Sequence, residues 1–160
     1  MFVGNSMTLH GKNPNIGWHG EWGMAASSIE NGARIHHLFE NARNFNADII
    51  VMRFVENCPQ NDFNKEVFKK AVADLLQYLN PSKHAEIILT TGFWRHPVDK
   101  GIIELAEELN MPLVKLGDLG EKDEMKSIGS FKHTGVSNHP GDLGMKNIAN
   151  RIFDVLKNYL

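Results

Sequence analysis

The sequence lacks the features that mark disulfide-rich, membrane-spanning and nucleic-acid-binding proteins. Its single cysteine, Cys58, allows no disulfide within the chain. No apolar run approaches the roughly 18 to 20 residues of a membrane span, and no basic-then-apolar leader opens the chain. Basic residues form no block, and the net charge is -2, so we expect neither nucleic acid nor a membrane as a partner. These absences predict a cytoplasmic protein as the chain stands, or a secreted one if an upstream signal peptide was removed.

Motifs for metals and nucleotides are also missing. The eight histidines form no His-Glu-x-x-His pattern, and the adjacent pair His36-His37 would point to different faces of a helix. The glycines Gly4 and Gly11 are spaced too far apart for a phosphate-binding loop, and Asn13 stands where such a loop needs serine or threonine. We therefore expect no metal and no cofactor. The sequence indicates no oligomeric state.

What is present is an alternation of strands and helices in one domain, residues 1–160. After a short first strand that ends at Gly4, continuous apolar centres predict three buried strands. Apolar residues at helical spacing predict helices around them, and Asn80-Pro81 should end the longest of these. This order predicts an α/β fold with a doubly wound parallel sheet. The predicted strands cover residues 47–55, 86–92 and 112–116, and the predicted helices lie at 31–44, 67–79, 102–109 and 145–159.

Ligands of such sheets bind beyond the carboxyl ends of the strands, which directs attention to three polar residues. Ser6 follows the first strand, Asn57 follows the second, and His139 lies in the loop that enters the last helix. We expect the three to converge on one edge of the sheet. Each has a structural alternative, because Ser6 fits an ordinary turn, Asn57 a strand-end cap and His139 a packed loop.

Together these residues match the needs of acyl transfer. A serine hydroxyl attacks an acyl carbon only when a base removes its proton, and a histidine does this near neutral pH. Ser6 is the candidate nucleophile and His139 the candidate base. Hydrogen-bond donors must also receive the charge that develops on the carbonyl oxygen. The candidates for this oxyanion hole are the backbone N–H groups of Ser6 and Gly23 and the side-chain amide of Asn57.

The order of these segments resembles the SGNH hydrolases, also called GDSL esterases and lipases. Gly4-Asn5-Ser6 matches the first block of the family with asparagine in place of aspartate, Asn57 matches the block-three asparagine, and His139-Pro140 matches the last block. The segment 22–27, Trp-Gly-Met-Ala-Ala-Ser, resembles block two of a bacterial subgroup with Gly-Asn-Ser starts. The resemblance spans nearly the whole chain. It implies a three-layer, flavodoxin-like fold and a serine esterase that works through an acyl-enzyme.

Besides Asn5, the usual glycine before Asn57 and the usual aspartate after it are absent, and one further departure bears directly on the chemistry. The family usually has an acid three residues before the histidine, where this chain has Val136. Either His139 works in a dyad, oriented by a backbone carbonyl, or an acid comes from elsewhere. Glu56 and Asp142 are the candidates for such an acid, although Asp142 also fits the N-cap of the last helix.

The sequence says less about the substrate than about the reaction. The family resemblance suggests an ester with a small acyl group, such as an acetyl group on a carbohydrate. Trp22, Phe93 and Trp94 are candidates for an aromatic wall around it, against the alternative of ordinary packing. The alternative function is a non-catalytic ligand-binding module on the same fold, in which the missing acid leaves the histidine poorly oriented.

Overall fold

The computed structural model describes residues 1–4, 40–53, 55–56 and 63–160 of the chain. Four parallel strands form one sheet in the order β1-β2-β3-β4. These strands are β1 (Phe2–Gly4), β2 (Ile49–Arg53), β3 (Glu86–Thr90) and β4 (Leu113–Val114). The register pairs Gly4 with Arg53, Met52 with Leu89, and Leu89 with Leu113. All four strands therefore end at the same edge of the sheet.

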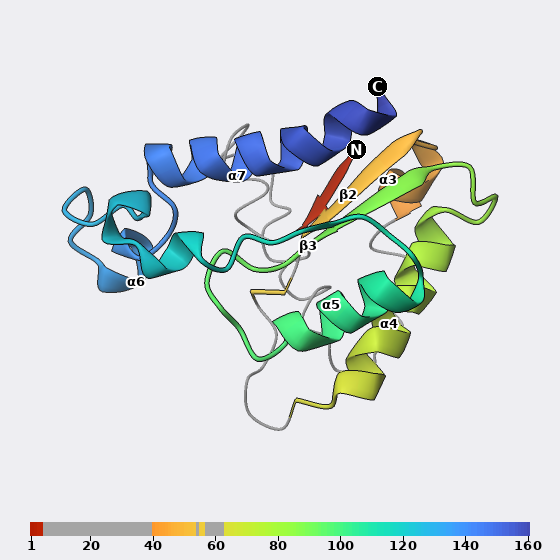
Figure 1. Cartoon of the computed structure of the whole chain (residues 1–160), viewed down its shortest axis with the longest axis horizontal. Coiled ribbons are helices and arrows are strands. Elements are labelled where there is room, and N and C mark those ends of the chain that lie inside the picture. Colours follow the sequence, from red (N-terminus) through yellow and green to blue (C-terminus); the bar gives the residue numbers. More distant parts are fainter. Residues whose placement is uncertain (5–39, 54, 57–62) are drawn as a thin grey trace.

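Helices α4 (Lys65–Leu79) and α5 (Asp99–Glu108) cover one face of this sheet (Figure 1). The apolar positions of α4 fall three and four residues apart, so they form one stripe that faces the strands. The Asn64 side chain caps the first turn by accepting a hydrogen bond from the Val67 N–H at 3.1 Å. The buried side chains of this layer are Phe68, Ala71, Val72, Leu75, Leu76 and Leu79 of α4 and Ile102, Leu105 and Ala106 of α5.

The opposite face carries α7 (Asp142–Leu156), as Figure 1 shows. Ile148 and Ile152 pack with Val51, Ile88 and Val114 of the sheet. The 3-10 helices η2 (Leu119–Glu121) and η3 (Asp123–Met125) fill the space between β4 and the start of α7. The remaining described elements are the short helices α3 (Glu40–Asn44), α6 (Thr134–Ser137) and η4 (Lys157–Tyr159).

The predicted α/β class and the parallel sheet are confirmed. The predicted strand at 112–116 is shorter than expected, since β4 spans only two residues. The described strands follow one another in chain order without the reversal that a doubly wound sheet requires. That finer part of the prediction stays a prediction.

The apolar face of the last helix is narrower than its sequence pattern indicates. Met145 and Tyr159, the first and last residues of the predicted helix 145–159, are 40% and 37% exposed, and Tyr159 lies beyond α7 in η4. The buried residues of α7 are Gly144, Ile148 and Ile152, which lie four residues apart. A Cβ atom on Gly144 would lie 2.1 Å from the carbonyl oxygen of Met125, so the absence of a side chain lets α7 approach η3 closely.

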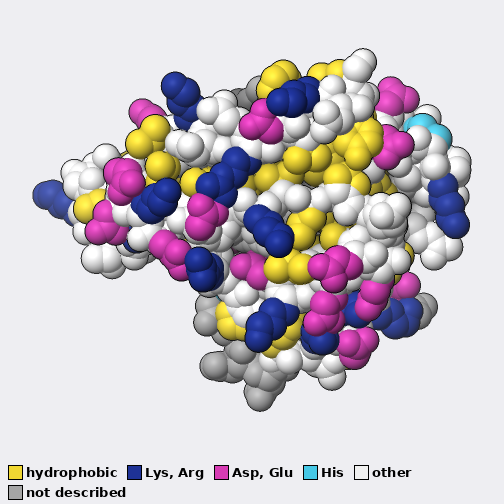
Figure 2. Space-filling view, viewed as in Figure 1, with side chains coloured by type: hydrophobic (Ala, Val, Ile, Leu, Met, Phe, Trp, Pro, Cys, Tyr) yellow, Lys and Arg dark blue, Asp and Glu magenta, His cyan; other side chains and the backbone are white. Residues whose placement is uncertain are grey.

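Charged side chains of both signs are interspersed over the face drawn in Figure 2. An ion-pair network joins the two helices on the sheet's first face. Lys65 Nζ lies 2.8 Å from Glu104 Oε2, and Lys69 pairs with Glu108. Three of these four side chains are 39–55% exposed and Lys69 is 11% exposed, so we treat the network as a minor contribution to stability.

Candidate functional site

His139 lies just past the end of α6, and its ring is held by that helix. The His139 N–H donates to the carbonyl of Val136 at 3.0 Å, and the ring atom Nδ1 lies 2.7 Å from the carbonyl oxygen of Gly135. The last carbonyls of a helix need partners from outside its own hydrogen-bond ladder, and the ring supplies one. Because a carbonyl oxygen only accepts, Nδ1 must carry the proton. The other ring nitrogen, Nε2, then has a free lone pair, which is the form a general base requires.

This arrangement answers the question raised by Val136. Val136 is 41% exposed, and the backbone carbonyl of the residue before it, Gly135, is the partner of Nδ1. Of the two alternatives left open by the sequence, the structure has the backbone carbonyl. The expectation that Glu56 or Asp142 supports the histidine is therefore corrected. Asp142 is also not the N-cap of α7, because Gly141 holds that position.

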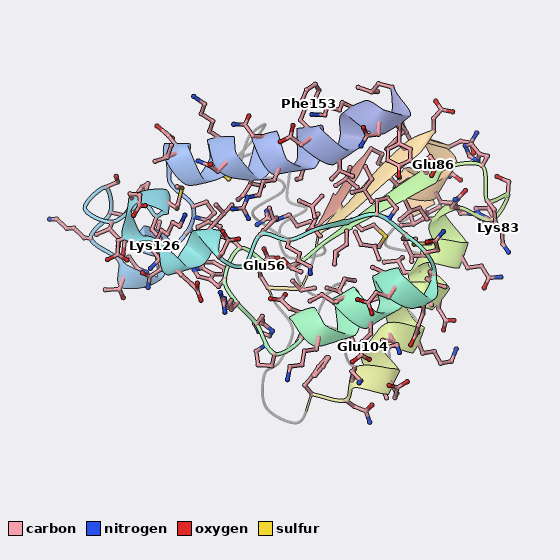
Figure 3. All side chains as sticks on the ribbon, in the orientation of Figure 1. Glu56, Lys83, Glu86, Glu104, Lys126 and Phe153 are labelled. Atoms are coloured by element: carbon pink, nitrogen blue, oxygen red, sulfur yellow. The ribbon has the colours of Figure 1, made fainter. Side chains whose placement is uncertain are left out.

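Glu56 instead joins the ends of two neighbouring strands. Its Oε1 accepts hydrogen bonds from Arg53 Nη2 at 2.7 Å and from the Phe93 N–H at 3.1 Å. Both charged side chains are at least nine-tenths buried, at 5% and 3% exposure. Figure 3 shows Glu56 where the strands end, on the side of the molecule that carries α6. Removing either charge would leave the other buried without this partner. The Glu56 carboxylate also links the end of β2 to the end of β3, because it accepts the Phe93 N–H.

Two of the three predicted wall residues are described, and their roles differ. Phe93 is fully buried and belongs to the core beneath α7, so it cannot line a ligand site. The prediction for Phe93 is corrected accordingly. Trp94 is half-buried and makes an edge-to-face contact with the His139 ring, with centroids 5.4 Å apart. It is the described aromatic residue that borders the candidate base.

A second polar cluster fixes the loop that follows β3. Asp99, the first residue of α5, accepts hydrogen bonds from the backbone N–H groups of Gly92 at 3.1 Å and His96 at 3.0 Å. Burial raises the pKa of the Asp99 carboxyl, although these two donors act in the opposite direction. Burial lowers the pKa of His96, whose Nδ1 accepts a hydrogen bond from the Val98 N–H at 3.2 Å. His96 is therefore held as the neutral ring with its proton on Nε2.

Sequence reasoning missed Arg53, His96 and Asp99. Arg53 carried a usable signal, because a charged residue inside an otherwise apolar strand needs a buried partner, and Glu56 follows three residues later. Asp99 also carried one, since an acidic residue in the first helical turn commonly accepts backbone N–H groups. His96 carried none, because its burial depends on how the loop folds.

The remaining predicted site residues lie outside the described part of the chain. These are Ser6, Gly23, Asn57 and Trp22. The described residues of the site come from three separate segments, which are brought together at the carboxyl edge of the sheet: Glu56 after β2, Phe93 and Trp94 after β3, and His139 after α6. The expected convergence of Ser6 and Asn57 on this edge stays a prediction.

A cleft of about 510 Å³ lies at the opposite edge of the sheet. It is lined by residues of the carboxyl ends of α4 and α5 and of the starts of β3 and β4, including Lys83 and Glu86, which Figure 3 labels. This cleft is separate from the loop that holds His139. Within the described residues, no group of three or more His, Cys, Asp or Glu side chains is arranged to hold a metal ion.

Comparisons with models of known protein families, with curated proteins and with solved structures returned no match. Among the helices of the described segments, none is long and apolar enough to cross a bilayer. Function is therefore inferred from the geometry of the site and from the order of motifs in the sequence.

Proposed function

We propose that this protein is a serine esterase of the SGNH type, which hydrolyses a carboxylic ester through an acyl-enzyme. The observation that carries the proposal is the hydrogen bond between His139 Nδ1 and the Gly135 carbonyl oxygen. It leaves Nε2 of the neutral ring as a base, without any need for the acid that the sequence lacks. The parallel α/β sheet supports the proposal, because it brings the ends of β1 and β2 to the edge where His139 lies.

In the proposed reaction, the Ser6 hydroxyl attacks the ester carbonyl while Nε2 of His139 takes its proton. The backbone N–H groups of Ser6 and Gly23 and the Asn57 amide receive the negative charge on the carbonyl oxygen. The protonated ring returns the proton to the leaving alcohol, and a water molecule then hydrolyses the acyl-enzyme by the same route. The Gly135 carbonyl stabilises the imidazolium through its dipole, without carrying the full charge of a carboxylate. An ester with a small acyl group, such as an acetylated carbohydrate, is the substrate class that the family resemblance favours.

The substitution Ser6→Ala tests the proposal. Loss of the nucleophile should lower the rate of p-nitrophenyl acetate hydrolysis by three powers of ten or more, on the order of 10⁶ where the residual background permits. Circular dichroism and the melting temperature should match those of the wild type, and Ser130→Ala, at an exposed serine, should leave the rate unchanged. Unchanged hydrolysis by folded Ser6→Ala protein, or no hydrolysis by the wild type, would instead favour a non-catalytic ligand-binding module.

A further inference from the structure

Trp94 contacts the candidate base in two ways. Its indole Nε1–H donates to the carbonyl oxygen of Asn138, the residue before His139, at 3.2 Å. Its ring meets the His139 ring edge-to-face, with an interplanar angle of 88°. One side chain therefore holds both the backbone next to the histidine and the histidine ring itself.

Contacts of the neighbouring backbone and of η2 fix the position of Trp94. The Phe93 N–H donates to the buried Glu56 carboxylate, and the Phe93 carbonyl accepts a hydrogen bond from the Gly120 N–H at 2.9 Å. A Cβ atom on Gly120 would lie 2.8 Å from Trp94 Cδ1, so η2 packs directly against the indole. The fully buried Phe93 ring adds an edge-to-face contact at 5.3 Å. Contacts from three segments thus fix the position of the tryptophan.

The helix that orients His139 has no comparable support of its own. α6 spans four residues, Thr134–Ser137, none of which is buried. A single helical turn is not stable alone, because nucleation costs more than one turn of hydrogen bonds returns. Two contacts outside α6 keep the histidine in place: the Ser127 N–H donates to the His139 carbonyl at 2.9 Å, and Trp94 contacts the ring and the carbonyl before it. The first holds only the backbone, so the ring itself depends on Gly135 and Trp94.

We propose that Trp94 is a positioning residue for His139, which holds the ring on the Gly135 carbonyl and so fixes the direction of Nε2. The inference deepens the proposed esterase function and rests on it for its catalytic meaning. The contact itself stands on the described residues alone. A displacement of about 1 Å in a catalytic group can cost roughly a hundredfold in rate, so a tryptophan in this place affects turnover without touching the ester.

A wall residue and a positioning residue respond differently to substitution. A residue that packs against the acyl group changes KM, and changes it differently for acetate and butyrate esters. A residue that positions the base changes kcat by the same factor for both esters, because the proton transfer is common to them. Trp94→Phe keeps an aromatic ring but loses the N–H donor, while Trp94→Ala loses both contacts.

The kinetic test compares these two variants with Phe131→Ala, a matched control at an exposed aromatic residue nearby in the chain. For Trp94→Phe we expect kcat to fall roughly fivefold to tenfold, the order of one lost hydrogen bond. For Trp94→Ala we expect about a hundredfold loss. KM should stay within about threefold for p-nitrophenyl acetate and butyrate, and Phe131→Ala should match the wild type. An unchanged kcat in Trp94→Ala, or a loss that appears only in KM, would overturn the proposal.

A second measurement tests the contact without any activity. A protonated imidazole in contact with an indole quenches its fluorescence, so wild-type tryptophan emission should fall between pH 8 and pH 5, where histidines ordinarily take up a proton. The fall should be smaller than in the wild type, and by the same amount, in Trp94→Phe and His139→Gln, because Trp18 and Trp22 also emit. It should persist in His133→Gln, which removes another exposed histidine beside α6. Other ionisable side chains on the adjoining segments are Glu56, Arg95, His96, Glu121, Lys126, His133 and Asp142.

The two arms separate failure of the inference from failure of the esterase proposal. If the wild type hydrolyses neither ester, the proposed function fails, and the fluorescence arm alone decides whether Trp94 holds His139. If the wild type hydrolyses both esters and Trp94→Ala does so equally fast, the positioning role fails and the esterase stands. A pH-dependent quench of full wild-type size in Trp94→Phe or His139→Gln would also overturn the contact.

Discussion

At the scale of single residues, the site depends on how a histidine is oriented without an acid. The Gly135 carbonyl holds His139 Nδ1 at 2.7 Å and thereby selects the tautomer with a free Nε2. A carbonyl is neutral, so it orients the ring but stabilises the imidazolium less than a carboxylate would. The orientation of the His139 ring therefore depends on the backbone of α6 and on the residues that pack against it.

We expect Val136→Asp to change kcat by no more than about threefold. The substitution restores an acid three residues before the histidine, but Nδ1 already has a partner and residue 136 points toward solvent. Steady-state hydrolysis of p-nitrophenyl acetate measures the effect, with Val136→Asn as the uncharged control. A gain of tenfold or more that is specific to aspartate would mean that the carbonyl does not orient the ring in the active state.

Asn57→Ala should slow turnover about a hundredfold if its amide donates to the oxyanion. The hydrogen bond strengthens as charge builds on the oxygen, so it contributes mostly to the transition state. The matched control is Asn64→Ala, which removes the cap of α4 and should lower the melting temperature without changing kcat. Measuring both quantities on the same preparations separates the roles. An Asn57→Ala protein that behaves like the control would make Asn57 a structural cap.

At the scale of elements, the structure shows that the carboxyl edge of the sheet is assembled by loop contacts. Glu56 links the β2 exit to the β3 exit, Asp99 closes the β3–α5 loop, and Trp94 reaches the end of α6. At the other side of the same edge, Arg151 on α7 makes a two-pronged ion pair with Asp118 at 2.5 and 2.7 Å. Glu56, Trp94 and Arg151 thus join segments more than 30 residues apart, whereas Asp99 closes its own loop.

Gly120→Ala should destabilise the protein by about 1–3 kcal/mol, the usual cost of forcing an atom into a packed region. The added Cβ would lie 2.5 Å from the Phe93 carbonyl oxygen, and neither that backbone nor Trp94 can move freely. Gly117→Ala is the control, because its Cβ would first meet the exposed and flexible Arg95 side chain, at 3.2 Å. Urea unfolding measures both. Equal losses in the two variants would show that the Gly120 contact is not tight in solution.

The elements that the sequence predicted are those whose signals are local. The apolar runs of β2 and β3 and the stripe of α4, ended by Asn80-Pro81, were correctly placed because burial on a sheet demands continuous or periodic apolar residues. α6, η2 and η3 were not predicted, because turns this short form only where tertiary contacts hold them. The sequence could not predict the hydrogen bond from His139 to Gly135 or the partner of Glu56, because these contacts also depend on tertiary structure.

At the scale of the whole molecule, buried titratable groups link stability to pH. The pKa of His96 is lowered by burial in the folded protein, so the unfolded chain takes up the proton first as the pH falls below about 6.5. This histidine therefore lowers the free energy of unfolding progressively from neutral pH toward acid, down to its own folded pKa. The raised pKa of Asp99 acts in the opposite sense, because the folded protein binds that proton first as the pH falls toward the usual range of an aspartate.

The substitution His96→Asn measures how much His96 contributes to the pH dependence of the free energy of unfolding. The asparagine oxygen can accept the Val98 N–H in place of Nδ1, but it does not titrate. We expect the variant to lose less stability than the wild type between pH 7 and pH 5.5, as measured by urea unfolding at both values. His133→Asn, at an exposed histidine, should behave like the wild type. An identical loss in His96→Asn and the wild type would mean that His96 is not held neutral by the fold.

The most direct test of the central claim, that Ser6 is a nucleophile activated by His139, is covalent labelling with a fluorophosphonate at pH 7.5. Intact-mass measurement of the wild type should show one probe per chain, and peptide mapping should place it on Ser6. Ser6→Ala should take up no probe, and His139→Gln should take it up far more slowly, because the serine keeps its proton without a base. Absence of labelling in the folded wild type, or labelling that is unaffected by Ser6→Ala, would contradict the claim.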